Sequence, residues 1–276
     1  MRTLLSCFNR LKSIQYPEDE RTPSSWFSVQ PCARIHFAGR EWIVTQPMST
    51  FWVYALGVLT IGAGLYFLQI RAGEASRLWW GVSLLLWGIG AVLAGTSYQA
   101  FGYQIKCTGG ETCCWTSWWE VVYLMFQQVS MSAMLAAIAY SCSTGPLREI
   151  LLIYAVVNST VYVAAIFISG IIPYKPLITF EFMVFASCPI FLMMIGVNGW
   201  RYLSLRESMD LALLGTWALL GVSMLAYWVY DKAKVTETLW AKGKGRWFSQ
   251  NDVLHVFLIV WIIYIAVVVS GQIHDM

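Results

Sequence analysis

Residues 252–271 read DVLHVFLIVWIIYIAVVVSG, a run in which only Asp252 carries a formal charge. A helix needs about 20 mostly apolar residues to cross the hydrocarbon core of a bilayer. Strands of a membrane barrel would alternate apolar and polar residues, so this continuous run predicts a membrane-spanning helix. Six further stretches have the same character: residues 51–70, 78–100, 118–140, 147–168, 178–199 and 209–230.

The composition of the 276-residue chain also indicates a membrane protein. Hydrophobic residues make up 58% and charged residues 12%, whereas soluble domains have about 45–50% and about 25%. We therefore exclude a soluble globule, a disordered chain and a coiled coil. We predict an all-α fold: a seven-helix transmembrane bundle over residues 48–276, preceded by an N-terminal interfacial or cap segment over residues 1–47.

Two features are predicted within residues 1–47. An interfacial helix would carry its apolar side chains on one stripe, at Leu4, Leu5, Phe8, Leu11 and Ile14. Residues 35–37 and 42–44 are short apolar runs that flank Ala-Gly-Arg-Glu. They form either a small hairpin or an irregular cap.

Seven crossings place the N-terminal segment and loops 101–117, 169–177 and 231–250 on one side of the membrane, which we call the N-terminal face. This face holds 13 of the 18 Lys and Arg residues, against five on the opposite face. Basic loops favour the cytoplasm. We therefore predict a cytoplasmic N-terminus, a C-terminus on the opposite side, and contact of the last loop with anionic lipid.

The second loop contains CTGGETCC, with Cys107, Cys113 and Cys114. Thiols in the cytoplasm stay reduced, so the predicted sidedness favours free cysteines. The alternative is a disulfide from Cys107 to Cys113 or Cys114, which would argue that the sidedness is inverted. No zinc site is predicted, because a structural site needs four ligands, commonly in Cys-x-x-Cys pairs.

Ionisable and amide side chains within spans are costly and are candidates for function. Here they gather where spans meet the N-terminal face. The candidate ligand-binding residues are Ser97, Gln99, Glu120, Tyr123, Gln127, Asp252 and His255. The alternative interpretation is structural: these are helix ends at the headgroup level, with Asp252 stabilising a helix N-terminus and His255 hydrogen-bonded to a neighbouring helix.

Other residues support packing rather than chemistry. Small residues at Gly88, Gly90, Ala91, Ala94 and Gly95 favour close helix contact. Tryptophans near predicted span ends are typical of an interfacial belt: Trp79, Trp80, Trp87, Trp118, Trp119, Trp200, Trp217, Trp228, Trp240, Trp247 and Trp261. The predicted spans contain no lysine for a retinal Schiff base and only His255 as a haem ligand. We predict no cofactor and no nucleic-acid partner, and we expect that bound lipid is possible.

Two segments, AGTSYQAFG at 94–102 and NDVLH at 251–255, resemble the heptahelical membrane hydrolase superfamily of alkaline ceramidases and progestin/adiponectin-type receptors. The resemblance implies a heptahelical fold and, in that superfamily, a zinc site of three His and one Asp that hydrolyses amides. Here Gln99 stands where the first His would be, residue 259 is Ile, and the third span has Glu120 in place of the Asp. One remaining His ligand, His255, is too few for catalytic zinc.

Three functions follow as hypotheses. The first is a non-catalytic accessory subunit of a larger membrane complex, because no complete catalytic or cofactor set is present. The second is a receptor or carrier for a lipid or small molecule, with a pocket near the N-terminal face. The third is a membrane hydrolase with a degenerate metal site.

Overall fold

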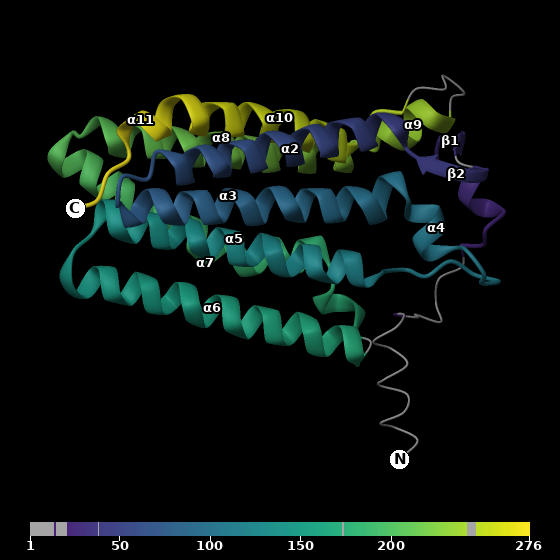
Figure 1. Ribbon diagram of the computed structural model, residues 1–276, viewed down its shortest axis with the longest axis horizontal. Helices are drawn as coiled ribbons and strands as arrows, with labels where there is room; N and C mark the ends of the chain where they lie inside the picture. The colour runs from purple at the N-terminus through teal and green to yellow at the C-terminus, as the bar shows by residue number, and fades with distance from the viewer. Residues whose placement is uncertain (1–13, 15–20, 38, 173, 242–246) are drawn as a thin grey trace, which may run out of the picture.

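The structure, a computed structural model, describes residues 14, 21–37, 39–172, 174–241 and 247–276. Seven helices are long and apolar enough to cross a membrane, and they run side by side (Figure 1). Their bounds are α2 (Pro47–Gln69), α3 (Ala75–Ala94), α5 (Trp118–Cys142), α6 (Gly145–Ile171), α7 (Phe180–Leu205), α8 (Ser208–Lys232) and α10 (Gln250–Tyr264). The predicted all-α bundle is confirmed, and the chain is a multi-pass integral membrane protein.

Two spans continue beyond their α-helices as π-helical segments, Gly95–Ala100 after α3 and Ile265–Val269 after α10. Short helices complete the chain: α4 (Gly102–Lys106), α9 (Val235–Ala241) and α11 (Ser270–Gln272). Helix α4, α9 and the small sheet lie at one end of the bundle, and the C-terminus lies at the other (Figure 1).

Of the two alternatives for the cap segment, the structure shows the hairpin. Strands β1 (Cys32–Phe37) and β2 (Arg40–Thr45) pair antiparallel, with Ile35 opposite Trp42. The predicted interfacial helix lies outside the described residues except for Ile14, which is buried against a cluster that includes Val121 and Leu124.

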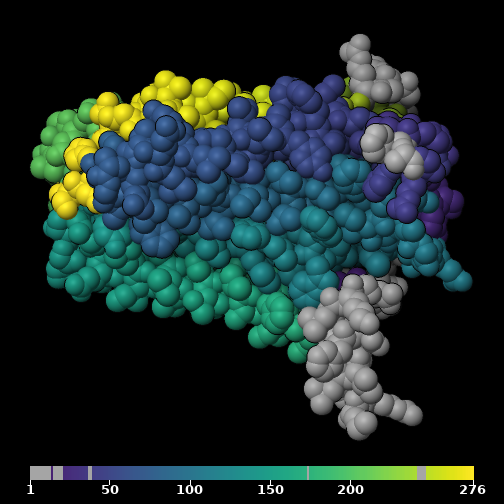
Figure 2. All heavy atoms as spheres, viewed as in Figure 1, coloured from purple at the N-terminus to yellow at the C-terminus, as the bar shows by residue number. Residues whose placement is uncertain are grey.

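Six of the spans form a ring, and the seventh lies outside it. Going round the ring, α2 contacts α3, α3 contacts α5, α5 contacts α7, α7 contacts α8, α8 contacts α10, and α10 contacts α2. Helix α6 packs mainly on the outer side of α5 and lies along one edge of the bundle (Figure 1). Atoms of α2, α3, α5 and α6 form a continuous surface in Figure 2.

Glycines allow α2 and α3 to approach backbone to backbone. A Cβ built on Gly88 of α3 would lie 2.8 Å from the Gly57 carbonyl oxygen of α2, and one on Gly64 would lie 2.9 Å from the Leu85 nitrogen. Real Cβ atoms do not come so close to backbone, so these positions have room only for hydrogen. The prediction that Gly88 supports close packing is confirmed.

Helices α3 and α5 are joined by a reciprocal pair of serines. The Ser83 hydroxyl donates to the Ser130 carbonyl oxygen, and the Ser130 hydroxyl donates to the Ser83 carbonyl oxygen, each at 2.8 Å. Both side chains are fully buried. Small hydroxyl residues thus satisfy their own polar groups while they keep the two helices close.

Four of the tryptophans predicted for an interfacial belt lie inside the ring instead. Trp80 stacks on Trp217 with ring centroids 6.0 Å apart, and Trp87 contacts Trp261 at 4.9 Å. All four are buried. The prediction of an interfacial position is wrong for these four residues, because an indole side chain packs inside a helix bundle as readily as at the headgroup level.

Asp275, which follows the seventh span, caps the N-terminus of α3. The Asp275 carboxylate accepts hydrogen bonds from the amides of Ala75 and Ser76, at 2.7 and 2.8 Å, at the first turn of α3. Partial burial raises the pKa of Asp275, but the hydrogen bonds from Ser76 and Ala75, together with the positive charge of Arg148, outweigh it and lower the pKa. The Arg77 guanidinium also donates to the Ile273 carbonyl oxygen.

We expect Gly88→Ala to lower the free energy of unfolding by about 1–3 kcal/mol, because the new methyl group must push α2 away from α3. Thermal unfolding in a single detergent measures the effect. The matched control is Gly62→Ala on α2, where a Cβ meets nothing within 4 Å. Equal stability of the two variants would contradict backbone contact between these helices.

Candidate functional site

A cavity of about 370 Å³ lies within the ring of six helices, lined by side chains from α2, α3, α5, α7, α8 and α10. Its volume falls in the range of small-molecule sites. Most of its wall is aliphatic, aromatic or methionine, as at Leu56, Met131, Phe191 and Leu258. The cavity therefore suits a ligand whose surface is largely apolar.

Three of the predicted site residues line this cavity: Tyr123 and Gln127 of α5, and His255 of α10. Gln127 is 6% exposed, and its Nε2 donates to the Trp87 carbonyl oxygen at 3.4 Å. Its Oε1 and the Nδ1 of His255 have no hydrogen-bond partner among the described residues. Buried polar atoms are normally paired, so these two are the atoms a ligand would satisfy.

Helical spacing explains why these groups share one wall. Tyr123, Gln127 and Met131 follow one another at intervals of four residues, so they lie on one face of α5. Gly90 of α3 leaves room for the amide, since a Cβ there would come within 3.3 Å of the Gln127 Nε2. On α10, His255 lies between the cavity-lining Leu254 and Leu258.

Ser97 and Glu120 belong to a different site, under the cap at the N-terminal face. The Glu120 carboxylate accepts hydrogen bonds from Ser97 and Thr116, each at 2.8 Å, and pairs with the Lys106 ammonium. Lys106 also lies over the Tyr98 ring, 4.9 Å from its centroid. Glu120 is 1% exposed, so it is a buried and fully paired carboxylate that does not reach the central cavity.

Asp252 stabilises a helix N-terminus, which is the structural alternative predicted from the sequence. It forms a capping box with Ser249 at the start of α10, and its Oδ2 also accepts from the Ser49 hydroxyl at 3.0 Å. Gln99 is buried on the π-helical segment and its Oε1 lacks a partner among the described residues, yet it does not line the central cavity. The predicted set of seven therefore divides between separate places.

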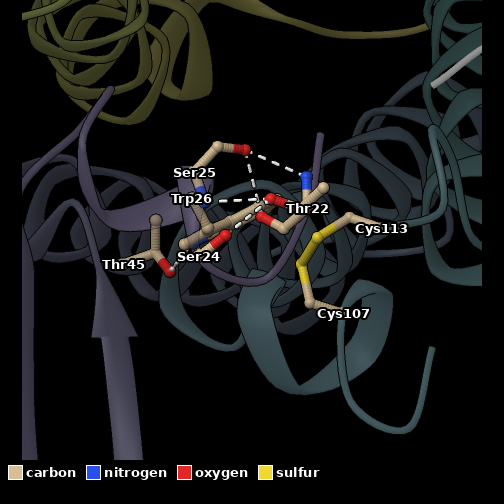
Figure 3. Close-up of a disulfide and its surroundings, with 7 residues drawn as sticks. All are labelled: Thr22, Ser24, Ser25, Trp26, Thr45, Cys107 and Cys113. Atoms are coloured by element: carbon tan, nitrogen blue, oxygen red, sulfur yellow. Dashed lines mark hydrogen bonds between the residues drawn. A yellow bond between two sulfur atoms is a disulfide. The ribbon is translucent and has the colours of Figure 1, made fainter. Parts of the chain in front are cut away.

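The prediction of free thiols in the second loop is wrong. Cys107 and Cys113 form a disulfide, packed with Trp26 in a small buried cluster (Figure 3). The Trp26 indole donates to the Thr45 hydroxyl of β2 at 3.2 Å, so one tryptophan contacts both the disulfide and the hairpin. The two cysteines are six positions apart around a Gly-Gly turn, which brings the sulfur atoms together, and Cys114 is not part of this disulfide.

Two buried polar clusters were not predicted. Arg201 of α7 binds Asp210 of α8 through two contacts of 3.2 Å at the opposite face. In the interior, the Gln128 amide donates to Asn158 of α6 and accepts from Ser187 of α7. Arg201 and Asp210 lie on either side of a break between two spans. Their opposite charges could have predicted this ion pair from the sequence.

One family model matches most of the chain. It is described as a family of unknown function (DUF6962), and it matches residues 48–273. The chain belongs to this family. No curated protein and no solved structure matches it. The region that defines the family includes all the residues that line the cavity.

The zinc site implied by the hydrolase resemblance has no ligand set in the family member described here. Over the described ranges, no three His, Cys, Asp or Glu side chains come together as they would around a metal ion. His255 faces the apolar cavity, and Glu120 is engaged with Lys106. We therefore derive no metal-dependent step.

We expect Glu120→Gln to destabilise the protein by about 3–5 kcal/mol, because it leaves the Lys106 charge buried without a counter-charge. Adding Lys106→Met should restore most of the loss, and thermal unfolding of both variants measures it. A single variant as stable as the double variant would show that the ion pair has no structural role.

Proposed function

We propose that this protein is a receptor or carrier that binds a lipid or another small apolar molecule in its central cavity. The observation that carries the proposal is the combination of an apolar cavity with two unpartnered buried polar atoms, Gln127 Oε1 and His255 Nδ1. A few placed polar groups in an apolar wall are typical of small-molecule sites.

The unpaired atoms support a ligand more strongly than the cavity volume does. A buried acceptor without a hydrogen bond costs about 1–3 kcal/mol. Two such atoms on facing helices, α5 and α10, would be a net cost to the fold unless a bound group satisfies them. Both belong to the set of side chains that we selected from the sequence as candidates.

The accessory-subunit hypothesis remains a prediction. Helices α6 and α7 expose large apolar side chains such as Ile153, Val156 and Phe185. Lipid covers such side chains as well as a protein partner does, so this exposure does not favour one over the other.

Filling the cavity tests the proposal. Gly221 of α8 lines the cavity, and a Cβ there would meet only the Phe191 ring, at 3.7 Å. We expect Gly221→Leu to lower the amount of apolar molecule that stays bound in native mass spectrometry severalfold. The matched control is Gly199→Leu on α7, where a Cβ meets nothing within 4 Å. Unchanged adducts in a folded Gly221→Leu variant would refute cavity binding.

We further propose that the N-terminal face lies in an oxidising compartment, opposite to the sidedness predicted from Lys and Arg. The support is the buried Cys107–Cys113 disulfide at that face, because such bonds do not persist in reducing cytosol. The excess of Lys and Arg on this face is also weaker evidence for the cytoplasm than the number suggests, because the charge of Lys106 is neutralised in a buried ion pair.

Protease access to sealed cells tests this orientation. An epitope inserted between Gly109 and Gly110, both exposed, should be cleaved from outside, whereas an epitope after Met276 should be protected. Cys107 should resist alkylation until a reductant is added. The reverse pattern of cleavage would restore the predicted cytoplasmic N-terminus.

A further inference from the structure

Resting on the proposed cavity function, we propose that the ligand is a neutral amphiphile taken from the bilayer, with an apolar body and a hydroxyl head group. Fatty acids, phospholipids and other charged lipids are excluded by this proposal. Three properties of the cavity carry it: its lack of charge, the kind of polar atoms it presents, and its position beside the lipid.

Among the residues that the structure describes, no Asp, Glu, Lys or Arg lines the cavity. Glu120 and Lys106 pair with each other beneath the cap. Asp252 is not part of the cavity wall: its Oδ2 accepts from Ser49 and Ser249, and its Oδ1 has no partner among the described residues. An ionised carboxylate or phosphate in the cavity would be a buried charge with no Lys or Arg to neutralise it, which costs far more than a buried neutral group. A charged head group is therefore disfavoured.

The two unpartnered atoms match a hydroxyl group. Gln127 Oε1 accepts a hydrogen bond, and His255 Nδ1 accepts or donates according to its tautomer. A hydroxyl both donates and accepts, so it pairs with either orientation of the amide and with either tautomer of the ring. The Tyr123 side chain, one turn before Gln127 on the same wall, adds a phenol hydroxyl.

We infer that the cavity opens to lipid between α7 and α8, because Cys188 of α7 both lines the cavity and is exposed. These helices touch at one end through Phe180 and Tyr227, with ring centroids 5.4 Å apart, and at the other through Arg201 and Asp210. Between those contacts lies Cys188, which lines the cavity and is exposed.

Two residues beside Cys188 favour such an opening. Pro189 has no amide hydrogen, so α7 lacks one backbone hydrogen bond next to Cys188. Across the seam, Gly221 of α8 presents no side chain. A ligand dissolved in the hydrocarbon reaches the cavity here without crossing the cap.

Photolabelling of the full chain in phosphatidylcholine vesicles tests the proposal. Three diazirine probes of equal chain length are compared: a long-chain alcohol, the matching carboxylic acid and the matching alkane. We expect the alcohol to label peptides of α5, α7, α8 and α10 about tenfold more than either of the others, and preloaded alcohol to protect Cys188 from N-phenylmaleimide.

Removing the acceptor should abolish the preference. We expect Gln127→Leu to reduce labelling by the alcohol about tenfold, the worth of one buried hydrogen bond, and to leave labelling by the alkane unchanged. The control is Thr160→Val on α6, which removes an exposed hydroxyl bonded only to the Val156 carbonyl oxygen. Thermal unfolding verifies that both variants are folded.

The outcomes separate the two proposals. Labelling of the cavity by the acid as strong as by the alcohol, or equal labelling by the alkane, would overturn the neutral hydroxyl ligand and leave cavity binding intact. Absence of cavity labelling with all three probes would overturn the proposed function itself.

Discussion

The close approach of α3 to both of its neighbours is the constraint on which the bundle depends. On one side glycines bring it against the backbone of α2, and on the other the Ser83–Ser130 exchange fixes it to α5. Hydrophobic force between helices is weak in lipid, so such short-range contacts supply the association. These contacts hold α2, α3 and α5 together as one side of the ring, whereas α7 makes fewer contacts with its neighbours in the ring.

The interior of the ring is filled unevenly, and this decides where the cavity lies. Trp80 and Trp217 stack together at one level, next to Phe67, and Trp87 contacts Trp261. Nearer the N-terminal face the inward residues are smaller or more flexible, such as Ala91, Ala94 and Met183. Bulky rings at one level and small residues at the next leave the cavity between the indoles and the Glu120–Lys106 pair.

The spans were predictable from sequence because length and hydropathy define a crossing without knowledge of its neighbours. The position of each side chain within the bundle could not be predicted in the same way. Glu120, Tyr123 and Gln127 share one stripe of α5, yet Glu120 joins the cap while the other two reach the cavity. Depth along the helix separates them, and hydropathy fixes depth only to within a turn or two. The buried tryptophans were missed for a related reason: spans apolar on all sides give no signal of which side faces lipid.

The hydrogen bonds from Ala75 and Ser76 to Asp275 impose an order on biogenesis. The turn between the first two spans is made before the other five spans, but the carboxylate that caps the helix after it follows the seventh span. Until then the first turn of α3 must rely on water or on the insertion machinery for its amide hydrogens. This cap therefore forms only after the seventh span has been made, and a nascent chain stalled in that span would lack it.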